Sequence, residues 1–231
     1  MRRYERRIHE LAEALIVVSD QDAPFFPSDK VTVVENGVDT DVFSPIEDVV
    51  RPKHIVFSGR MGYGPNAEAA QWFVRECLPT IRTHVPEATL SIVGADPPRS
   101  VQRLAKQSGV TVTGFVDSIA RAVNEASVVV VPLQSGSGIQ NKILEAMACA
   151  RPIVTTTIGR GAIQAADGRE LLVADGRAAF ADAVIALLED RPRAEALGLR
   201  ARAYVVENHS WERAGDLVER IYERLAHPAP Q

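Results

Sequence analysis

One stretch of the sequence, residues 134–148 (QSGSGIQNKILEAMA), carries residue types that could bind a phosphorylated ligand. It follows an apolar run at 128–133, which predicts a buried strand, and it leads into an apolar-periodic segment, which predicts a helix. Gly136 and Gly138 would let the backbone approach a ligand closely. The N–H groups of the first helical turn, expected at residues 139–141, favour an anion, and a nucleotide diphosphate suits this arrangement.

Two charged side chains of the predicted helix would extend such a site. Lys142 adds a full positive charge in the first turn, and Glu145 lies one turn further along, where a carboxylate can accept hydrogen bonds from ribose hydroxyls. A helix start shaped only for packing, with Lys142 and Glu145 solvated, explains the local pattern as well, because glycine-rich strand-to-helix loops are common in α/β proteins. The pattern alone leaves both interpretations open.

The composition fits an ordinary folded protein of one large α/β domain, or of a domain and a fragment, in 231 residues that are 46% hydrophobic and 24% charged. A net charge of -4 gives no overall electrostatic footprint for nucleic acid. Cys77 and Cys149 lie in apolar helical patterns, which predicts reduced core residues. The histidines show no ligand spacing, so we expect no metal site.

The sequence has no apolar run of the ~18 to 20 residues that cross a bilayer, and the opening residues, MRRYERR, lack an apolar signal segment behind them. These features predict a cytoplasmic location. Residues 2–13 form a charged helical pattern whose basic side chains could face anionic lipid at the inner membrane surface, although a solvated helix face is the simpler explanation.

Strand and helix patterns alternate regularly from residue 52 onward. We expect strands at 54–58, 88–93, 110–113, 128–131, 153–155 and 170–173, and helices at 65–83, 101–107, 119–124, 139–148, 177–188, 194–207 and 211–225. A buried strand at 14–19 and a short strand at 31–34 precede them. Such alternation predicts an α/β fold with a Rossmann-like, doubly wound parallel sheet that binds its ligand at the carboxyl ends of the strands.

The segment Gly138–Ala148, followed by residues 151–156 (RPIVTT), resembles the nucleotide-sugar signature of retaining GT-B glycosyltransferases of family 4. It is most similar to the sugar transferases associated with exopolysaccharide and PEP-CTERM (EpsH) systems. The resemblance implies a hexosyltransferase-type enzyme of polysaccharide biosynthesis. Its donor would be a nucleoside-diphosphate sugar of UDP or GDP type, its acceptor a saccharide or lipid-linked sugar, and it would need no bound metal.

Residues 35–39 (ENGVD), continuing to Pro45, resemble the connector that joins the N-terminal acceptor domain of these enzymes to the C-terminal donor domain. The resemblance implies that residues 1–35 are a remnant of the acceptor domain with its connector. Residues 36–208 would be the Rossmann-like nucleotide-sugar-binding domain, and residues 209–231 the crossover helix and a disordered tail. An acceptor domain of about 150 residues would be expected before the connector. The sequence is therefore expected to be part of a longer chain, or a donor-binding half whose other half is elsewhere.

The resemblance also assigns residues. Arg60 corresponds to the basic residue that contacts the donor diphosphate. The lysine that usually follows it a few positions later is absent, since Asn66 lies in that neighbourhood. We expect Lys142, from the later glycine-bearing segment, to take over the role of that lysine. Residues 112–117 (VTGFVD) resemble the loop that recognises the base, although Phe115 seen alone would more often be a core residue. Of the two family glutamates, Glu145 is the second, and Ser137 replaces the first, which usually touches the transferred sugar.

The complete predicted site combines both lines of reasoning. Arg60, Lys142 and Glu145 are the expected catalytic residues, and the expected nucleotide-sugar-binding residues are Gly59, Arg60, Thr113, Gly114, Phe115, Val116, Ser137, Gly138, Ile139, Gln140, Asn141, Lys142 and Glu145. Two other functions stay open. One is a non-catalytic nucleotide-binding module without an acceptor domain, and the other is a nucleotide-sugar epimerase, which shares the GT-B architecture.

Overall fold

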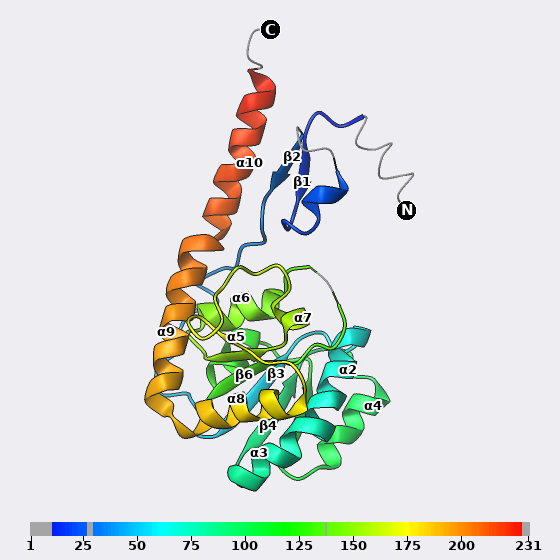
Figure 1. The fold of residues 1–231 in the computed structure, drawn as a ribbon, viewed down its shortest axis with the longest axis vertical. Coiled ribbons are helices and arrows are strands. Elements are labelled where there is room, and N and C mark those ends of the chain that lie inside the picture. The colour runs from blue at the N-terminus through cyan, green and yellow to red at the C-terminus, as the bar shows by residue number, and fades with distance from the viewer. Residues whose placement is uncertain (1–10, 27–29, 137, 228–231) are drawn as a thin grey trace.

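The computed structural model of the chain describes residues 11–26, 30–136 and 138–227. Two parallel sheets organise these residues, a six-stranded one in the body of the molecule and a separate pair above it (Figure 1). The pair consists of β1 (Leu15–Val17) and β2 (Val31–Val33). Most of the helix predicted at 2–13, and the last residues of the predicted tail, lie outside the described residues.

The six-stranded sheet is parallel throughout and has the order β5-β4-β3-β6-β7-β8. Its strands are β3 (His54–Ser58), β4 (Thr89–Val93), β5 (Val110–Gly114), β6 (Val128–Val131), β7 (Ile153–Thr155) and β8 (Leu172–Val173). The chain runs outward from β3 to β5, returns to place β6 beside β3, and runs outward again to β8. The direction of winding therefore reverses between β3 and β6, and ligands of such sheets bind in the crevice at this point. The predicted doubly wound fold is confirmed.

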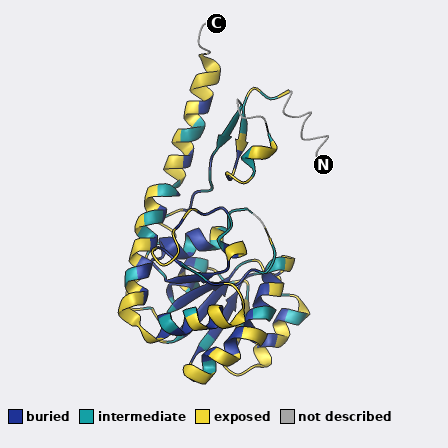
Figure 2. Cartoon of the chain, viewed as in Figure 1, coloured by how far each residue is buried: buried dark blue, intermediate teal, exposed yellow. Residues whose placement is uncertain are grey.

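Helices cover both faces of this sheet. They are α2 (Gly64–Trp72), α3 (Leu78–His84), α4 (Arg99–Gln102), α5 (Ile119–Asn124), α6 (Asn141–Ala148), α7 (Thr157–Arg160), α8 (Arg177–Glu189), α9 (Arg191–Asn208) and α10 (Trp211–Ala226). One layer contains α2, α3 and α8, and the other contains α5, α6 and α9. A sheet covered on both faces needs strands that are apolar on both sides. The four valines of β6 meet this need, since all are fully buried, and Figure 2 shows the sheet as the buried centre of the body.

Several predicted elements differ in detail. The helix expected at 65–83 is interrupted by a π-helical turn at Phe73–Cys77, directly before α3. Pro79 supplies the reason, because it has no N–H to bond the carbonyl four residues earlier. The helix expected at 101–107 starts at Arg99 and tightens into a 3-10 turn at Arg103–Lys106. The short helix α7 and a 3-10 turn at Ala23–Phe25 were not predicted.

The cysteine prediction is confirmed, since Cys77 and Cys149 are both buried free thiols. The expectation of a buried strand at 14–19 is wrong in part. Ile16 and Val18 are 49% and 42% exposed, because β1 has only β2 beside it and no described layer covers its outer face. Among the described residues, no helix is both long enough and apolar enough to cross a bilayer.

The last helix, α10, packs beside the β1-β2 pair and rises away from the body (Figure 1). Ile221 and Ala214 form a small second core with Val34, and Leu217 lies partly buried against it. The apolar face of this helix is thus covered in part by the first segment of the chain. Trp211 and Tyr222 remain more than half exposed.

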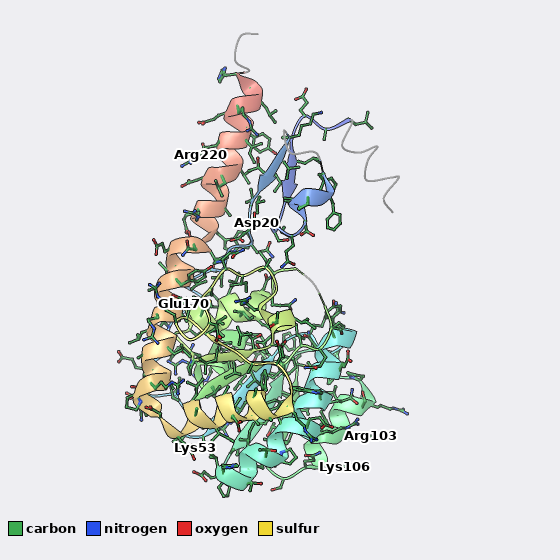
Figure 3. All side chains as sticks on the ribbon, in the orientation of Figure 1. Asp20, Lys53, Arg103, Lys106, Glu170 and Arg220 are labelled. Atoms are coloured by element: carbon green, nitrogen blue, oxygen red, sulfur yellow. The ribbon has the colours of Figure 1, made fainter. Side chains whose placement is uncertain are left out.

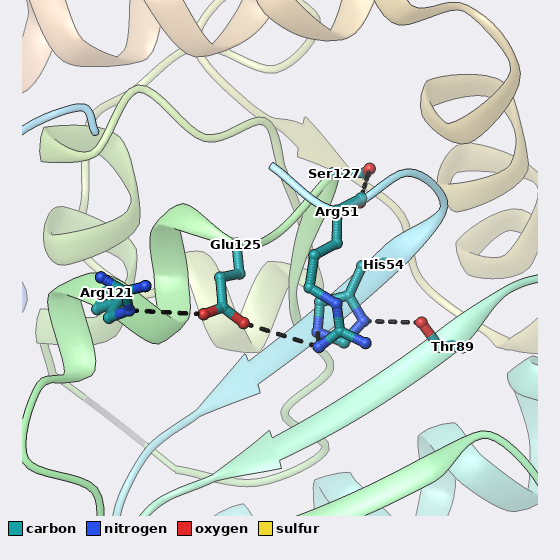
Figure 4. A network of polar contacts seen from close by, with 6 residues as sticks. All are labelled: Arg51, His54, Thr89, Arg121, Glu125 and Ser127. Atoms are coloured by element: carbon teal, nitrogen blue, oxygen red, sulfur yellow. Dashed lines mark hydrogen bonds and ion pairs between the residues drawn. The ribbon is translucent and has the colours of Figure 1, made fainter. Parts of the chain in front are cut away.

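A polar network fixes the amino-terminal end of β3 (Figure 4). His54 is buried, and its Nδ1 lies 2.8 Å from Thr89 Oγ1 on β4. Arg51 lies 3.5 Å from His54 Nε2 and 3.7 Å from the Glu125 carboxylate, which in turn contacts Arg121. Burial lowers the pKa of His54 from 6.5 to about 4, and the charge of Arg51 lowers it further. The imidazole is therefore neutral in the folded protein near pH 7.

This burial predicts a pH-dependent stability. Between pH 6.5 and about 4 the unfolded chain binds a proton that the folded chain does not, so the free energy of unfolding falls as the pH drops through that window. The loss due to His54 should be about 1 kcal/mol between pH 7.5 and 5.5. Urea unfolding of the wild type and of His54→Gln measures it. The pH slope should be smaller in His54→Gln but unchanged in the control His84→Gln, whose side chain is exposed. Equal slopes in all three proteins would contradict this account.

Candidate functional site

The loops after β3 and β6 meet where the sheet reverses direction, and Gly59 is the point of closest approach. Its φ of +149° is a conformation that side chains rarely adopt. A Cβ atom added there would lie 2.9 Å from Asn66 Nδ2 and 3.0 Å from Lys142 Cε. The Lys142 side chain therefore reaches from α6 to the backbone at the end of β3. This contact brings two predicted site residues together across the crevice.

Lys142 is a partly buried cation. Its Nζ donates a hydrogen bond to Gln140 Oε1 at 2.8 Å. Burial lowers its pKa from 10.5 to about 8, and the nearby Glu145 opposes this shift. Burial likewise raises the pKa of Glu145, and Lys142 opposes that shift. The two residues lie one helical turn apart, and burial shifts the pKa of each toward its neutral form.

The helix α6 begins at Asn141, two residues later than expected, with Gln140 at the N-cap position. The Gln140 side chain makes no capping hydrogen bond to the backbone amides of the first turn, and the unbonded amides of a helix start are donors that suit an anion. The prediction that the first turn covers Ile139 and Gln140 is therefore wrong. Both residues lie in the extended segment that leads into the helix, because the backbone of Gln140 is not helical.

The connector touches this helix start. Asn36 Nδ2 donates a hydrogen bond to Asn141 Oδ1 at 3.0 Å. Val38 N donates to the His209 carbonyl at 2.8 Å, where α9 gives way to α10. The turn that resembles a domain connector is thus bonded to the candidate site on one side and to the last helix junction on the other.

Arg60 lies at the same edge of the sheet, but its guanidinium is engaged elsewhere. Its Nε donates to Asp96 Oδ2 at 3.0 Å, and the side chain is 76% exposed. The Arg60 carbonyl accepts a hydrogen bond from Asn66 Nδ2 at 2.9 Å. The structure therefore brings the Arg60 backbone to the crevice, while its charge is paired with the loop after β4. Its predicted contact with a diphosphate stays a prediction.

The predicted base-recognition loop follows β5, two strands from β3, which corresponds to roughly 10 Å along the sheet edge. Gly114 has a φ of +69°, and Thr113 Oγ1 donates to its carbonyl. Phe115 is 77% exposed, so it is not a core residue, and Val116 is partly buried. An exposed aromatic ring beside a partly buried aliphatic side chain offers a surface for a flat heterocycle. Ser118 follows this loop and caps α5, with its side chain accepting a hydrogen bond from Arg121 N.

Ser137, predicted to lie near the transferred sugar, is outside the described residues. Its neighbour Gly138 is within them, with a φ of +79°. The turn after β7 packs directly on this loop, because a Cβ atom added at Gly161 would collide with the Gly138 carbonyl oxygen. Arg160 immediately precedes this contact, and its Nε is buried without a hydrogen-bond partner. Sequence reasoning missed Arg160, although a cation between two glycines, in the turn that follows a strand, is a signal that could have identified it.

Among the described residues, no group of three or more histidine, cysteine, aspartate or glutamate side chains has an arrangement suited to a metal ion. The elements that do converge are a helix start, a glycine at the end of β3, one lysine and one glutamate. These groups are chemically complementary to a phosphorylated nucleoside. The amides and the ammonium suit phosphate oxygens, and the carboxylate suits hydroxyl groups.

Known proteins share this sequence pattern and fold. Residues 52–190 match the family described as glycosyl transferases group 1. The chain is 29% identical to the alpha-maltose-1-phosphate synthase of Mycolicibacterium smegmatis, over 96% of this chain and 66% of that protein. It is 30% identical to a GDP-mannose-dependent phosphatidylinositol monomannoside mannosyltransferase of Mycobacterium tuberculosis, over 90% of this chain and 60% of that one.

The fold also matches a solved structure. Anabaena HepE, crystallised with UDP and glucose, superposes with a TM-score of 0.75 at 16% identity, over 97% of this chain and 66% of HepE. The chain therefore spans about three fifths to two thirds of the length of these relatives. The family match covers more than half of the present chain and includes the crevice residues from Gly59 to Glu145. This chain belongs to the group 1 glycosyl transferases and carries the C-terminal domain of a GT-B fold.

Proposed function

We propose that this chain is the donor-binding part of a retaining glycosyltransferase. It would bind a nucleoside-diphosphate sugar and support transfer of the sugar to a saccharide or lipid-linked acceptor in polysaccharide biosynthesis. The observation that carries the proposal is the reach of Lys142 across the crevice to Gly59, with Glu145 one turn behind it. The names of two relatives support the same class of reaction, since one is a synthase of a sugar phosphate and the other a GDP-mannose-dependent mannosyltransferase.

In the proposed mechanism the leaving diphosphate is stabilised by fixed charges and dipoles. The amides at the start of α6 and the Lys142 ammonium would meet the phosphate oxygens as negative charge develops on them. Arg60 would join them by turning from Asp96, an exposed partner that costs little to leave. Glu145 would hold the ribose hydroxyls. We propose that this chemistry needs no resident metal ion.

The proposal extends to the organisation of the chain. Residues 1–35 would belong to an acceptor-side lobe and its connector, residues 36–208 to the donor domain, and residues 209–231 to the crossover helix and tail. The contacts of α10 with β1-β2, and of Asn36 with Asn141, support this division. A role in exopolysaccharide synthesis of the PEP-CTERM (EpsH) type is the more specific form of the same proposal, and it rests on sequence resemblance alone.

Calorimetric titration with UDP, GDP and their sugar conjugates tests donor binding directly. Lys142→Met should weaken binding of the preferred nucleotide by about 10-fold or more, because a hydrogen bond to a charged group contributes about 1.5–3 kcal/mol. The matched control is Lys106→Met, since Lys106 is exposed and lies far from α6 (Figure 3). If no nucleotide binds saturably to the wild type, the proposed function is wrong.

The lowered pKa of Lys142 predicts how donor affinity depends on pH. The phosphates bind the protonated amine, and the free protein loses that proton near pH 8 instead of near 10.5. Affinity should therefore fall by about 10-fold between pH 7 and 9, with net proton uptake on binding at pH 8 to 9. Titrations in buffers of different ionisation enthalpy measure the uptake. Lys142→Met should abolish both effects, and an unchanged affinity up to pH 9.5 in the wild type would contradict the assignment.

Glu145 generates a separate prediction, because its proposed partner is the ribose. Glu145→Gln should weaken UDP or GDP binding about 5- to 50-fold while leaving inorganic pyrophosphate affinity within about 2-fold, since pyrophosphate has no hydroxyls for a carboxylate to bind. The exposed Glu87→Gln is the control. An equal loss for both ligands would show that Glu145 acts only through Lys142 and the helix.

Product analysis separates the remaining functions. Transfer or donor hydrolysis by this chain, or by this chain with an acceptor lobe supplied, is expected for the proposed enzyme. Saturable nucleotide binding without any product would favour a non-catalytic module, and conversion of the donor sugar to a stereoisomer would favour an epimerase.

A further inference from the structure

Besides Lys142 and Arg60, a further cation lies at the carboxyl edge of the sheet, on the β7 side of the candidate site. Arg160 is the last residue of α7, directly after β7, and is partly buried. Its Nε is shielded from solvent and has no hydrogen-bond partner. Its backbone N–H and carbonyl are hydrogen-bonded to Thr156 and Ile163, but its side chain forms no ion pair or hydrogen bond within the described part of the chain.

An unpartnered guanidinium nitrogen is costly to bury. A desolvated donor without an acceptor destabilises the folded state, and the penalty is larger for a charged group than for a neutral one. Arg51, Arg121, Arg169, Arg177 and Arg191, by contrast, all pair with carboxylates. Arg160 therefore has the property expected of a side chain whose partner is a ligand.

The position of Arg160 relative to the donor loop is fixed by the next residue. Gly161 packs so closely on the Gly138 carbonyl that no side chain would fit there, and its φ is +56°. The α7 turn and the glycine loop before α6 are thus in van der Waals contact, and Figure 1 shows α7 beside α6 on the side of the body that faces the β1-β2 pair. Arg160 is adjacent to the predicted donor loop but comes from a different strand.

If the proposed function holds, the order of the strands indicates which part of the nucleotide sugar lies near Arg160. A nucleotide sugar is linear, with base, ribose, diphosphate and sugar in that sequence. The base loop follows β5, and the diphosphate site lies between β3 and β6. The sugar must then extend past β6, toward β7, where Arg160 lies.

We propose that Arg160 forms an oxyanion subsite on the sugar side of the diphosphate. It would bind a carboxylate or phosphate carried either by the transferred sugar or by the acceptor. A guanidinium suits both groups because its planar donors can contact two oxygens at once. Arg160 would be a specificity-determining residue that selects an acidic sugar, beyond the general binding of the nucleotide.

The test uses the 231-residue chain and ligands that differ by one anionic group. UDP-glucose and UDP-glucuronate are compared by calorimetry, or GDP-mannose and GDP-mannuronate if GDP is the preferred nucleotide. Glucose and glucose 6-phosphate are compared at saturating nucleotide. We expect one acidic ligand to bind at least about 10-fold more tightly than its neutral counterpart. Preference within the first pair assigns the anion to the donor, and preference within the second assigns it to the acceptor.

Arg160→Ala should remove that preference while changing the affinity for UDP or GDP alone by less than about 2-fold, and Arg160→Lys should restore part of it. The exposed Arg103, at the opposite end of the molecule from β1-β2 (Figure 3), provides the control Arg103→Ala. Melting temperatures show whether each variant folds. If Arg160→Ala does not fold, the test uses Arg160→Lys, which should keep its nucleotide affinity and lose part of the acid preference.

Two results would overturn the proposal. One is the absence of any difference between acidic and neutral ligands that depends on Arg160. The other is an equal loss of affinity for the bare nucleotide, which would place Arg160 at the diphosphate. If the wild type binds neither UDP nor GDP, the proposed function fails together with this subsite. If the wild type and every variant bind one of these nucleotides normally, and none prefers the acidic ligand, only the proposed Arg160 subsite is wrong.

Discussion

The contact between Lys142 and the backbone of Gly59 is the constraint on which the candidate site depends. It requires a glycine at the end of β3, because a Cβ atom there would press on the lysine stem and on Asn66. It also requires α6 to start directly above the β3/β6 crevice, which the reversal of strand order provides. A lysine held in this way loses much of its hydration, and its lowered pKa is the direct consequence.

The surrounding structure keeps that crevice rigid. Gly94 at the end of β4 lies so close to the Gly59 carbonyl that a side chain would not fit. The fully buried valines of β6 and the buried face of α6, with Ile143, Leu144 and Met147, lock the opposite wall. Close-packed interiors resist small displacements, so the positions of Gly59 and Lys142 follow from the core. The polar network around His54 fixes the amino-terminal end of the same strand, β3.

The features predicted best from the sequence were the limits of the buried strands, because apolar runs alone determine them. The limits of β3, β6 and β7 were correct because each is a short apolar run bounded by polar or turn residues, and a parallel sheet covered on both faces accepts only such runs. The start of α6 was misplaced by two residues, since no strong capping residue marks Asn141. The pairing of Arg60 with Asp96 could not be predicted, because it joins loops that only the fold brings together. Arg160 was missed because α7 is a single turn with no periodicity to detect.

The connector explains how a second lobe would communicate with this site. Asn36 is hydrogen-bonded to Asn141 at the start of α6, and two residues later Val38 is bonded to the backbone of His209, between α9 and α10. The small core of Val34, Ala214 and Ile221 ties β2 to α10 beyond that point. A lobe carried by β1-β2 and α10 would therefore pivot on residues that contact the start of α6, where we propose that the phosphates bind. Because a displacement of the connector would shift Asn36 against Asn141, movement of such a lobe would disturb the start of α6 and, with it, the proposed donor site.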